Sequence, residues 1–285
     1  MAMKLLNQQI FENKEAAALP CLLESGGLPA LISGLSSVHR ANFAAALFER
    51  LEMPLFVICP DEASADSFAR DLEAMTGIKP CMLFSRDFTF YPTLAASRQA
   101  EQQRIGTLSA LIRGESRITV ATVSGLLQRT MPPQTLLDAC FEIADGGECP
   151  PEELERVLLR CGYEKCEQVE GTGQYARRGG ILDFFSPMYQ EPVRIEFWGD
   201  DIDSMGFFDV HTQRRTQAID KCRILPAAEA LVSLSGGRQA VCKKLSAMAD
   251  RCSRHKSSPQ LKDLEATLRG DIERIENDIR LENLD

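Results

Sequence analysis

An alternation of apolar and polar side chains over residues 193–198 places the tightest constraint on how this chain folds. Its apolar and polar members are, in turn, Val193, Ile195 and Phe197, and Arg194, Glu196 and Trp198. Because successive side chains of a β-strand point to opposite faces, the pattern predicts a strand with one buried and one solvated face. An apolar segment at 180–185 precedes it, and the turn residues Gly199-Asp200-Asp201 follow it. Residues 177–215 are therefore predicted to form a meander that presents a docking face.

The first part of the chain, residues 28–128, alternates short apolar runs with helical patterns. Runs typical of buried parallel strands lie at residues 31–32, 55–58, 82–84 and 118–121. Between them, apolar residues recur at helical spacing within 63–75 and 98–112. Strands that alternate with helices favour a parallel sheet covered by helices, so the fold class predicted here is α/β.

Turn-forming residues separate this α/β part from the meander. Prolines and glycines cluster at 131–133 and 145–151, and Pro151 followed by two glutamates predicts the start of a helix. We expect three parts: residues 1–128 as the first part of the α/β domain, 129–225 as a small α+β domain, and 226–285 as a helical segment that returns to the first domain. The last helical pattern, at 271–284, meets no glycine or proline, which predicts a truncated chain.

Composition excludes several classes of protein. The formal net charge of −9 gives no general attraction for nucleic acid. No apolar run reaches the roughly 18 residues of a membrane span, and no secretory signal is evident, so we expect a cytoplasmic protein. Ten cysteines are present, but none forms a Cys-x-x-Cys pair. Cys161 and Cys166 are the only close pair, and reduced, buried thiols without a metal are expected.

The loop after the first predicted strand is where a nucleotide-binding fold would hold phosphate. A working P-loop needs several glycines, a lysine and a hydroxyl residue in sequence. This loop has one glycine, Gly34, and then Val38, His39 and Arg40. We expect Ser36 or Ser37 to cap the following helix, and we expect no nucleotide or other cofactor to bind.

The sequence shows no combination of side chains typical of a catalytic site. His39 lies in the loop just described, and His211 and His255 lie in polar segments, so no catalytic site is predicted. A protein-binding set is more promising, because arginine and tryptophan are enriched at interface hot spots. It consists of Arg178, Arg194 and Trp198. The alternative is that Arg194 pairs locally with Glu196 or Asp183 and that Trp198 covers a small cluster; the pattern alone leaves both interpretations open.

These same residues carry a family resemblance. The segments at 175–187, 192–204 and 208–214 resemble the UvrB-homology module of bacterial transcription-repair coupling factors (Mfd). The shared pattern is a tyrosine, two residues, Arg-Gly-x-x-x-Asp-x-Phe, a loop, and Arg-x-Glu-Phe-x-Gly-Asp-x-Ile. Segments at 60–65, 97–104 and 120–128 are also similar, so the resemblance covers most of residues 28–228.

UvrB itself is the nearest alternative. It would require a working P-loop, yet Val38, His39 and Arg40 stand where UvrB has glycine, lysine and threonine. It would also require an aromatic-rich DNA-clamping hairpin, and the segment from Phe88 has few aromatic residues. These departures favour the coupling factors over a UvrB-like ATPase that binds damaged DNA.

The resemblance implies a degenerate P-loop NTPase-like domain without ATPase activity, followed by a domain that binds the repair protein UvrA. The family's UvrA-contacting arginines fall on Arg178 and Arg194, and a family phenylalanine falls on Trp198. In the parent chain this surface is masked by a C-terminal domain until RNA polymerase is engaged, so a purely autoinhibitory module remains an alternative. The resemblance places the polymerase-binding domain and the ATP-driven DNA translocase outside these residues.

Overall fold

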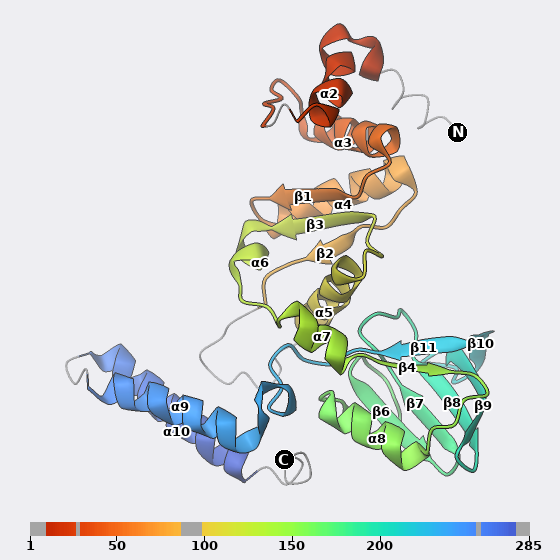
Figure 1. Cartoon of the computed structure of the whole chain (residues 1–285), viewed down its shortest axis with the longest axis vertical. Helices are drawn as coiled ribbons and strands as arrows, with labels where there is room; N and C mark the ends of the chain where they lie inside the picture. The colour runs from red at the N-terminus through yellow and green to blue at the C-terminus, as the bar shows by residue number, and fades with distance from the viewer. Residues whose placement is uncertain (1–9, 27–28, 87–98, 255–257, 278–285) are drawn as a thin grey trace. The chain divides into compact units, whose positions relative to one another are not determined.

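The computed structural model of the chain describes residues 10–26, 29–86, 99–254 and 258–277. The chain divides into two compact units, Met1–Arg129 and Thr130–Asp285, and the fold is mixed α/β (Figure 1). Within the described residues, no helix combines the length and the apolar character that a membrane span requires.

The first unit is built on a parallel three-stranded sheet, as predicted. Its strands run in the order β1-β3-β2, with Leu55 opposite Ile118 and Cys81 opposite Thr119. In chain order the elements are η1 (Ile10–Glu12), α2 (Lys14–Glu24), α3 (Ser37–Leu51), β1 (Leu55–Cys59), α4 (Glu62–Thr76), β2 (Cys81–Leu83), α5 (Gln99–Ile112), β3 (Ile118–Thr122) and α6 (Val123–Leu127).

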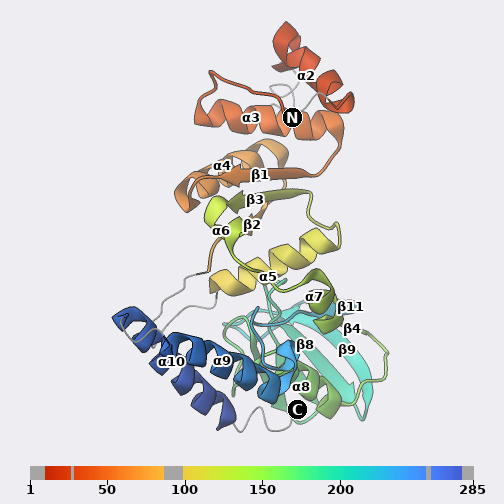
Figure 2. The ribbon, with the colours of Figure 1, turned by 60° about the vertical axis from the view of Figure 1, so that its left-hand side comes forward.

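Helices cover this sheet unequally. Every residue of the central strand β3 is buried, and Ile118 and Val120 belong to one apolar cluster with residues of α3 and α4. Figure 2 shows α3 and α4 side by side next to β1. On β1, by contrast, Phe56 and Ile58 are exposed. Helix α4 begins where the Asp61 carboxylate accepts a hydrogen bond from the backbone N–H of Ser64 (2.8 Å), which satisfies a helix-end donor. The first unit therefore has one well-covered sheet face.

The predicted strand at 31–32 is wrong. Leu31 and Ile32 lie in irregular chain, and 95% of the Leu31 surface is exposed. A run of two apolar residues carries no periodicity, so the prediction depended mainly on its position before a glycine-containing loop. Backbone pairing contradicts the prediction: β1 pairs with β3, and residues 29–36 form no strand that would extend the sheet.

The second unit contains the predicted meander. Its six-stranded sheet has the order β10-β9-β8-β7-β6-β5, and a separate antiparallel pair joins β11 to β4. In chain order the elements are α7 (Pro133–Ala139), β4 (Phe141–Ala144), α8 (Pro151–Arg160), β5 (Glu164–Lys165), β6 (Gln174–Arg178), β7 (Ile181–Phe184), β8 (Val193–Trp198), β9 (Asp201–Phe208), β10 (Arg215–Ala218), β11 (Lys221–Ile224), η2 (Ser233–Ser235), α9 (Gly237–Ser253) and α10 (Pro259–Glu276).

Helix α8 forms the core of this unit with one face of the sheet (Figure 1). The helix starts at Pro151 as predicted, and Gly162, with a φ of 83°, follows its end. Leu154 and Leu158 of α8 are fully buried against Leu182 of β7 and Ile195 of β8. Burial of this apolar surface is the main term that stabilises the meander, and it fixes which side of the sheet faces inward.

Helices α9 and α10 follow the sheet in the same compact unit. They pack on each other, and α10 ends at Glu276, so half of the helical pattern predicted at 271–284, residues 278–284, lies outside the described residues. The return of residues 226–285 to the first domain remains a prediction.

Truncation of a core leucine tests the packing of α8. Leu154→Ala removes a fully buried side chain, and we expect it to lower the free energy of unfolding by about 2–5 kcal/mol. The same substitution at Leu127, which is 81% exposed, should change it by less than about 0.5 kcal/mol. Urea unfolding monitored by circular dichroism measures the free energy of unfolding of both variants. An equal loss in the two variants would contradict the packing of Leu154 in the core.

Candidate protein-binding site

Strand register sorts the meander residues into two faces. We call the side that α8 does not cover the outer face. One row across it runs from Arg178 through Ile181 and Glu196 to Ser204, and the next from Ala176 through Asp183 and Arg194 to Gly206. Trp198 follows Glu196 by two residues on β8, so it lies on the outer face as well. The alternation predicted for 193–198 is thus confirmed.

Asp183 is the centre of the outer face. Its side chain is 1% exposed. Its Oδ1 accepts a hydrogen bond from Arg194 Nε at 2.7 Å, and its Oδ2 accepts from Arg194 Nη2 at 2.9 Å and from Arg178 Nη2 at 3.0 Å. A carboxylate removed from water requires such partners, because an unpaired buried charge costs several kcal/mol. The two arginines are therefore joined through one buried carboxylate.

Arg194 is held on several sides. Its Nη1 donates to the carbonyl oxygen of Gln213 at 3.2 Å, and its Nη2 donates to Gln213 Oε1 at 3.1 Å. The guanidinium carbon lies 4.4 Å from the centre of the Phe208 ring, a cation–π distance. The hydrogen bonds to Asp183 raise the pKa of Arg194 above its ordinary value. Of the two pairings left open by the sequence, Arg194 makes the one with Asp183.

A tight loop brings Gln213 to Arg194. Asp209 Oδ1 accepts from the backbone N–H of Thr212 at 2.7 Å, and Gln213 Nε2 donates to the carbonyl oxygen of Val210 at 2.8 Å. Gln213 has a φ of 59°, in the left-handed region that non-glycine residues adopt at a cost. Gln213 is not among the predicted site residues, and the only local signal for it in the sequence is the turn-forming pair Asp209 and Thr212.

Trp198 and Arg178 extend from the other end of this cluster. Trp198 is 81% exposed and covers no cluster, whereas the Arg178 side chain is 51% exposed. Their strands end in two neighbouring hairpin turns, one at Gly179-Gly180 and one at Gly199-Asp200, and Phe197 N–H donates to Gly180 O at 2.8 Å. The small cluster that does lie on the outer face is instead formed by Val169, Ala176 and Phe208.

The loop predicted to resemble a P-loop precedes α3. Gly34 has a φ of 81°, and Ser36 is the residue before the helix, as predicted. The Ser36 hydroxyl does not cap the helix backbone; it lies 3.0 Å from His39 Nδ1. Arg40 Nε donates to Leu35 O at 3.2 Å, and Val38 is 52% exposed. Residues 33–40 contain no lysine, the side chain that a working P-loop directs to the phosphates.

The two neighbouring cysteines have separate environments. Cys161 belongs to the core beneath α8, where burial raises its pKa to about 12, and Cys166 packs against the outer-face cluster. Across the described parts of the chain, no group of three or more metal-ligating side chains is assembled. His211 is exposed, and His255 lies outside the described residues.

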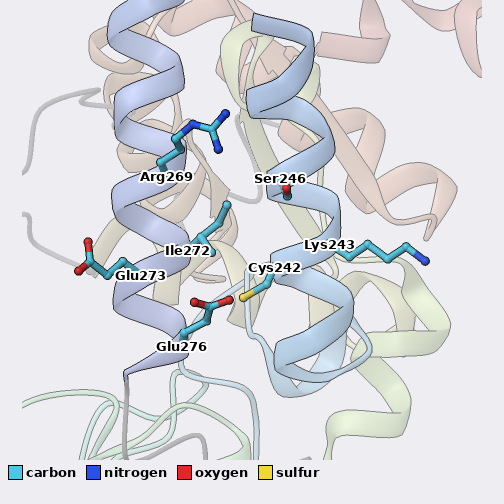
Figure 3. Close-up of a pocket in the computed structure, with 7 residues that line it drawn as sticks. All are labelled: Cys242, Lys243, Ser246, Arg269, Ile272, Glu273 and Glu276. Carbon is cyan, nitrogen blue, oxygen red and sulfur yellow. The ribbon is translucent and has the colours of Figure 1, made fainter. Parts of the chain in front are cut away.

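A groove of about 430 Å³ lies between α9 and α10 (Figure 3). Its lining residues are Cys242, Lys243, Ser246, Arg269, Ile272, Glu273 and Glu276. Figure 3 shows Lys243 pointing away from α10. Arg269 is engaged by Asp250 and Glu265, at 3.4 Å and 2.9 Å. The groove therefore offers opposite charges without a converging set of polar groups.

Comparison with known proteins places the meander in a described family. Residues 141–229 match the UvrB interaction domain. The chain is 32% identical over 208 residues to a transcription-repair-coupling factor of Myxococcus xanthus, covering 70% of this chain and 17% of that protein. It is 28% identical over 254 residues to that of Bacillus subtilis, covering 89% and 22% respectively. For that of Escherichia coli (strain K12), the identity is 28% over 199 residues, covering 70% and 17%. The chain thus spans about a fifth of the length of these relatives.

The buried carboxylate yields a prediction about stability. Asp183→Asn removes the charge that compensates Arg194 and Arg178, and we expect it to lower the free energy of unfolding by about 3 kcal/mol or more. The same substitution at Asp203, an exposed residue of β9, should change it by less than about 0.5 kcal/mol. Chemical unfolding of both variants measures this free energy. A loss for Asp183→Asn as small as that for Asp203→Asn would show that the carboxylate does not hold the outer face.

Proposed function

We propose that this chain, which belongs to the transcription-repair-coupling factors as their UvrB-homology module, recruits the nucleotide excision repair protein UvrA through its outer face. The module is N-terminal in the family that the sequence resembles. The match to the UvrB interaction domain spans residues 141–229 and so contains the whole outer-face cluster. A UvrA-type partner is the one that this family relationship favours.

The observation that carries the proposal is the arrangement around Asp183. An exposed indole, a half-exposed guanidinium and a buried ion cluster lie on one face of a rigid sheet. Arginine and tryptophan provide most of the binding energy at many interfaces, since each combines a large contact area with directional polar groups. Trp198 stands where the family has a phenylalanine, and it keeps an aromatic anchor of larger size.

We also propose that the first unit is a degenerate relative of P-loop NTPases and has no ATPase activity of its own. The residues at the start of α3 support this, because Val38, His39 and Arg40 replace the groups that bind phosphate and magnesium. The proposed role of the chain is therefore recruitment rather than catalysis.

Further roles belong to the whole coupling factor. There we propose an ATP-driven DNA translocase, contacts with RNA polymerase and DNA, and a C-terminal domain that masks the outer face until polymerase is engaged. Masking and recruitment would use the same surface of this chain, so an outer-face variant should weaken both interactions.

A binding titration tests recruitment. We expect Trp198→Ala and Arg194→Ala each to weaken the affinity of the chain for UvrA by about 30-fold or more, the loss typical of a central interface residue. Isothermal titration calorimetry against purified UvrA measures it. The Trp198 variant should unfold at the wild-type temperature, because its side chain is 81% exposed.

Arg178→Ala has a matched control in Arg269→Ala. Both side chains are about half exposed, at 51% and 53%, and both take part in ion pairs. We expect a weakened affinity for UvrA only in the Arg178 variant. Equal UvrA affinity in the wild type and in the Arg178, Arg194 and Trp198 variants would refute the proposed surface.

The nucleotide proposal has its own test. We expect no saturable heat of ATP binding when the chain is titrated with ATP and magnesium, because the loop lacks the phosphate-binding groups. A stoichiometric binding isotherm would contradict the degenerate P-loop, while leaving the outer-face proposal unaffected.

A further inference from the structure

We propose that Arg194 is a positioning residue and that Arg178, Ile181 and Trp198 make the direct contacts with the partner. This division of roles rests on the proposed function, because it concerns the same UvrA-binding surface. The partner group that fits is a carboxylate next to an apolar side chain. Ile181, which the sequence pattern did not single out, becomes part of the contact surface.

The count of hydrogen-bond donors separates the two arginines. A guanidinium has five N–H donors. Arg194 makes four hydrogen bonds, two to Asp183 and two to Gln213. Arg178 makes one with the described residues, from Nη2 to Asp183 Oδ2. Only Arg178 therefore retains the two parallel donors that a bidentate bond to a carboxylate requires.

Exposure separates them in the same direction. The Arg194 side chain is 16% exposed, since it lies against the Phe208 ring and beneath the loop at 209–214. The corresponding value for Arg178 is 51%. An incoming carboxylate can reach Arg178 without any change in the chain, whereas it would have to displace Gln213 from Arg194.

The exposed residues lie together at one end of the sheet. Arg178 is directly opposite Ile181, and Ile181 is directly opposite Glu196, which precedes Trp198 by two residues. Strand spacing places neighbours in a row roughly 5 Å apart and places Trp198 roughly 7 Å beyond that row. Ile181 is 36% exposed and Trp198 81%, so a guanidinium and two apolar side chains form one contact patch.

Charge complementarity argues for an acidic partner group. Asp183 compensates one of the two guanidinium groups that it binds, which leaves one positive charge in the cluster. Glu196 lies in the same row as Arg178, but its carboxylate is paired with Arg215, whose Nη2 lies 3.7 Å from Glu196 Oε1. The uncompensated charge is located at Arg178, the more exposed member of the cluster.

Asp183 connects Arg194 to Arg178. The Oδ2 atom of Asp183 accepts from Nη2 of both arginines, so the position of the carboxylate sets the position of Arg178. Arg194 holds that carboxylate by hydrogen bonds to both of its oxygens, and two further hydrogen bonds to Gln213 hold the Arg194 guanidinium itself. Without Arg194, the carboxylate becomes available for a bidentate bond with Arg178, which would consume the donors that the partner needs.

A double-mutant cycle on UvrA binding separates positioning from contact. We expect Arg178→Ala and Arg194→Ala each to weaken UvrA affinity by about 30-fold or more, and the double variant to be within about 3-fold of Arg178→Ala. A direct contact by Arg194 would instead make the two losses multiply. Ile181→Ala should weaken affinity by about 10-fold, and unchanged affinity there would contradict the contact patch.

Gln213→Gly repeats the test without removing a charge, for the case in which Arg194→Ala unfolds. Glycine adopts the φ of 59° readily, so the fold should be retained, while Arg194 loses its bond to Oε1. We expect about a 3-fold loss of UvrA affinity in the wild-type background and none in the Arg178→Ala background. A loss that persists in the Arg178→Ala background would overturn the positioning role.

The proposed function and this inference fail in different ways. If Arg178→Ala and Trp198→Ala both leave UvrA affinity unchanged, the recruitment surface itself is wrong. If those two variants weaken binding while Arg194→Ala adds its full loss to Arg178→Ala, the surface stands and the positioning role of Arg194 is wrong.

Discussion

One buried carboxylate organises the outer face of the six-stranded sheet. Asp183 lies in the middle of the six-stranded sheet, on the face that α8 does not cover, and two arginines satisfy its oxygens. An ion buried in this way is costly unless it is paired, so the sheet register that brings Arg194 opposite Asp183 is also the register that the charge favours. The inner leucines stabilise the sheet, and the ion cluster specifies how its outer side chains are arranged.

This arrangement gives a physical account of the proposed recruitment. The sheet holds the proposed contact residues in place before a partner binds, which lowers the entropic cost of ordering them on binding. The loop at 209–214 adds to this rigidity by holding Gln213 in a left-handed conformation beside Arg194. In the first unit, residues 33–40 contain no lysine, consistent with the proposed loss of nucleotide binding. The match to the UvrB interaction domain and the geometry of the outer face therefore both favour the proposed docking role.

The sequence predicted the parts of the fold that depend on long, regular patterns. Residues 193–198 alternate without interruption, so both the strand and its two faces could be predicted. The run at 31–32 was too short to distinguish a strand from irregular chain. The choice of Asp183 over Glu196 as the partner of Arg194 depends on the register between β7 and β8, and the place of Gln213 depends on a loop conformation. Neither of these is encoded in a local pattern, so the outer-face position of Arg194 and Trp198 could be predicted from the sequence, but the hydrogen bonds of Arg194 to Asp183 and Gln213 could not.

A structure of this chain bound to UvrA tests the central claim most directly. The account predicts a UvrA carboxylate within hydrogen-bonding distance of the Arg178 guanidinium, apolar UvrA side chains on Ile181 and Trp198, and Arg194 still bonded to Asp183 and Gln213. A complex in which UvrA binds away from the outer face would contradict the account. So would one in which a UvrA carboxylate replaces Gln213 on Arg194 and leaves Arg178 in solvent.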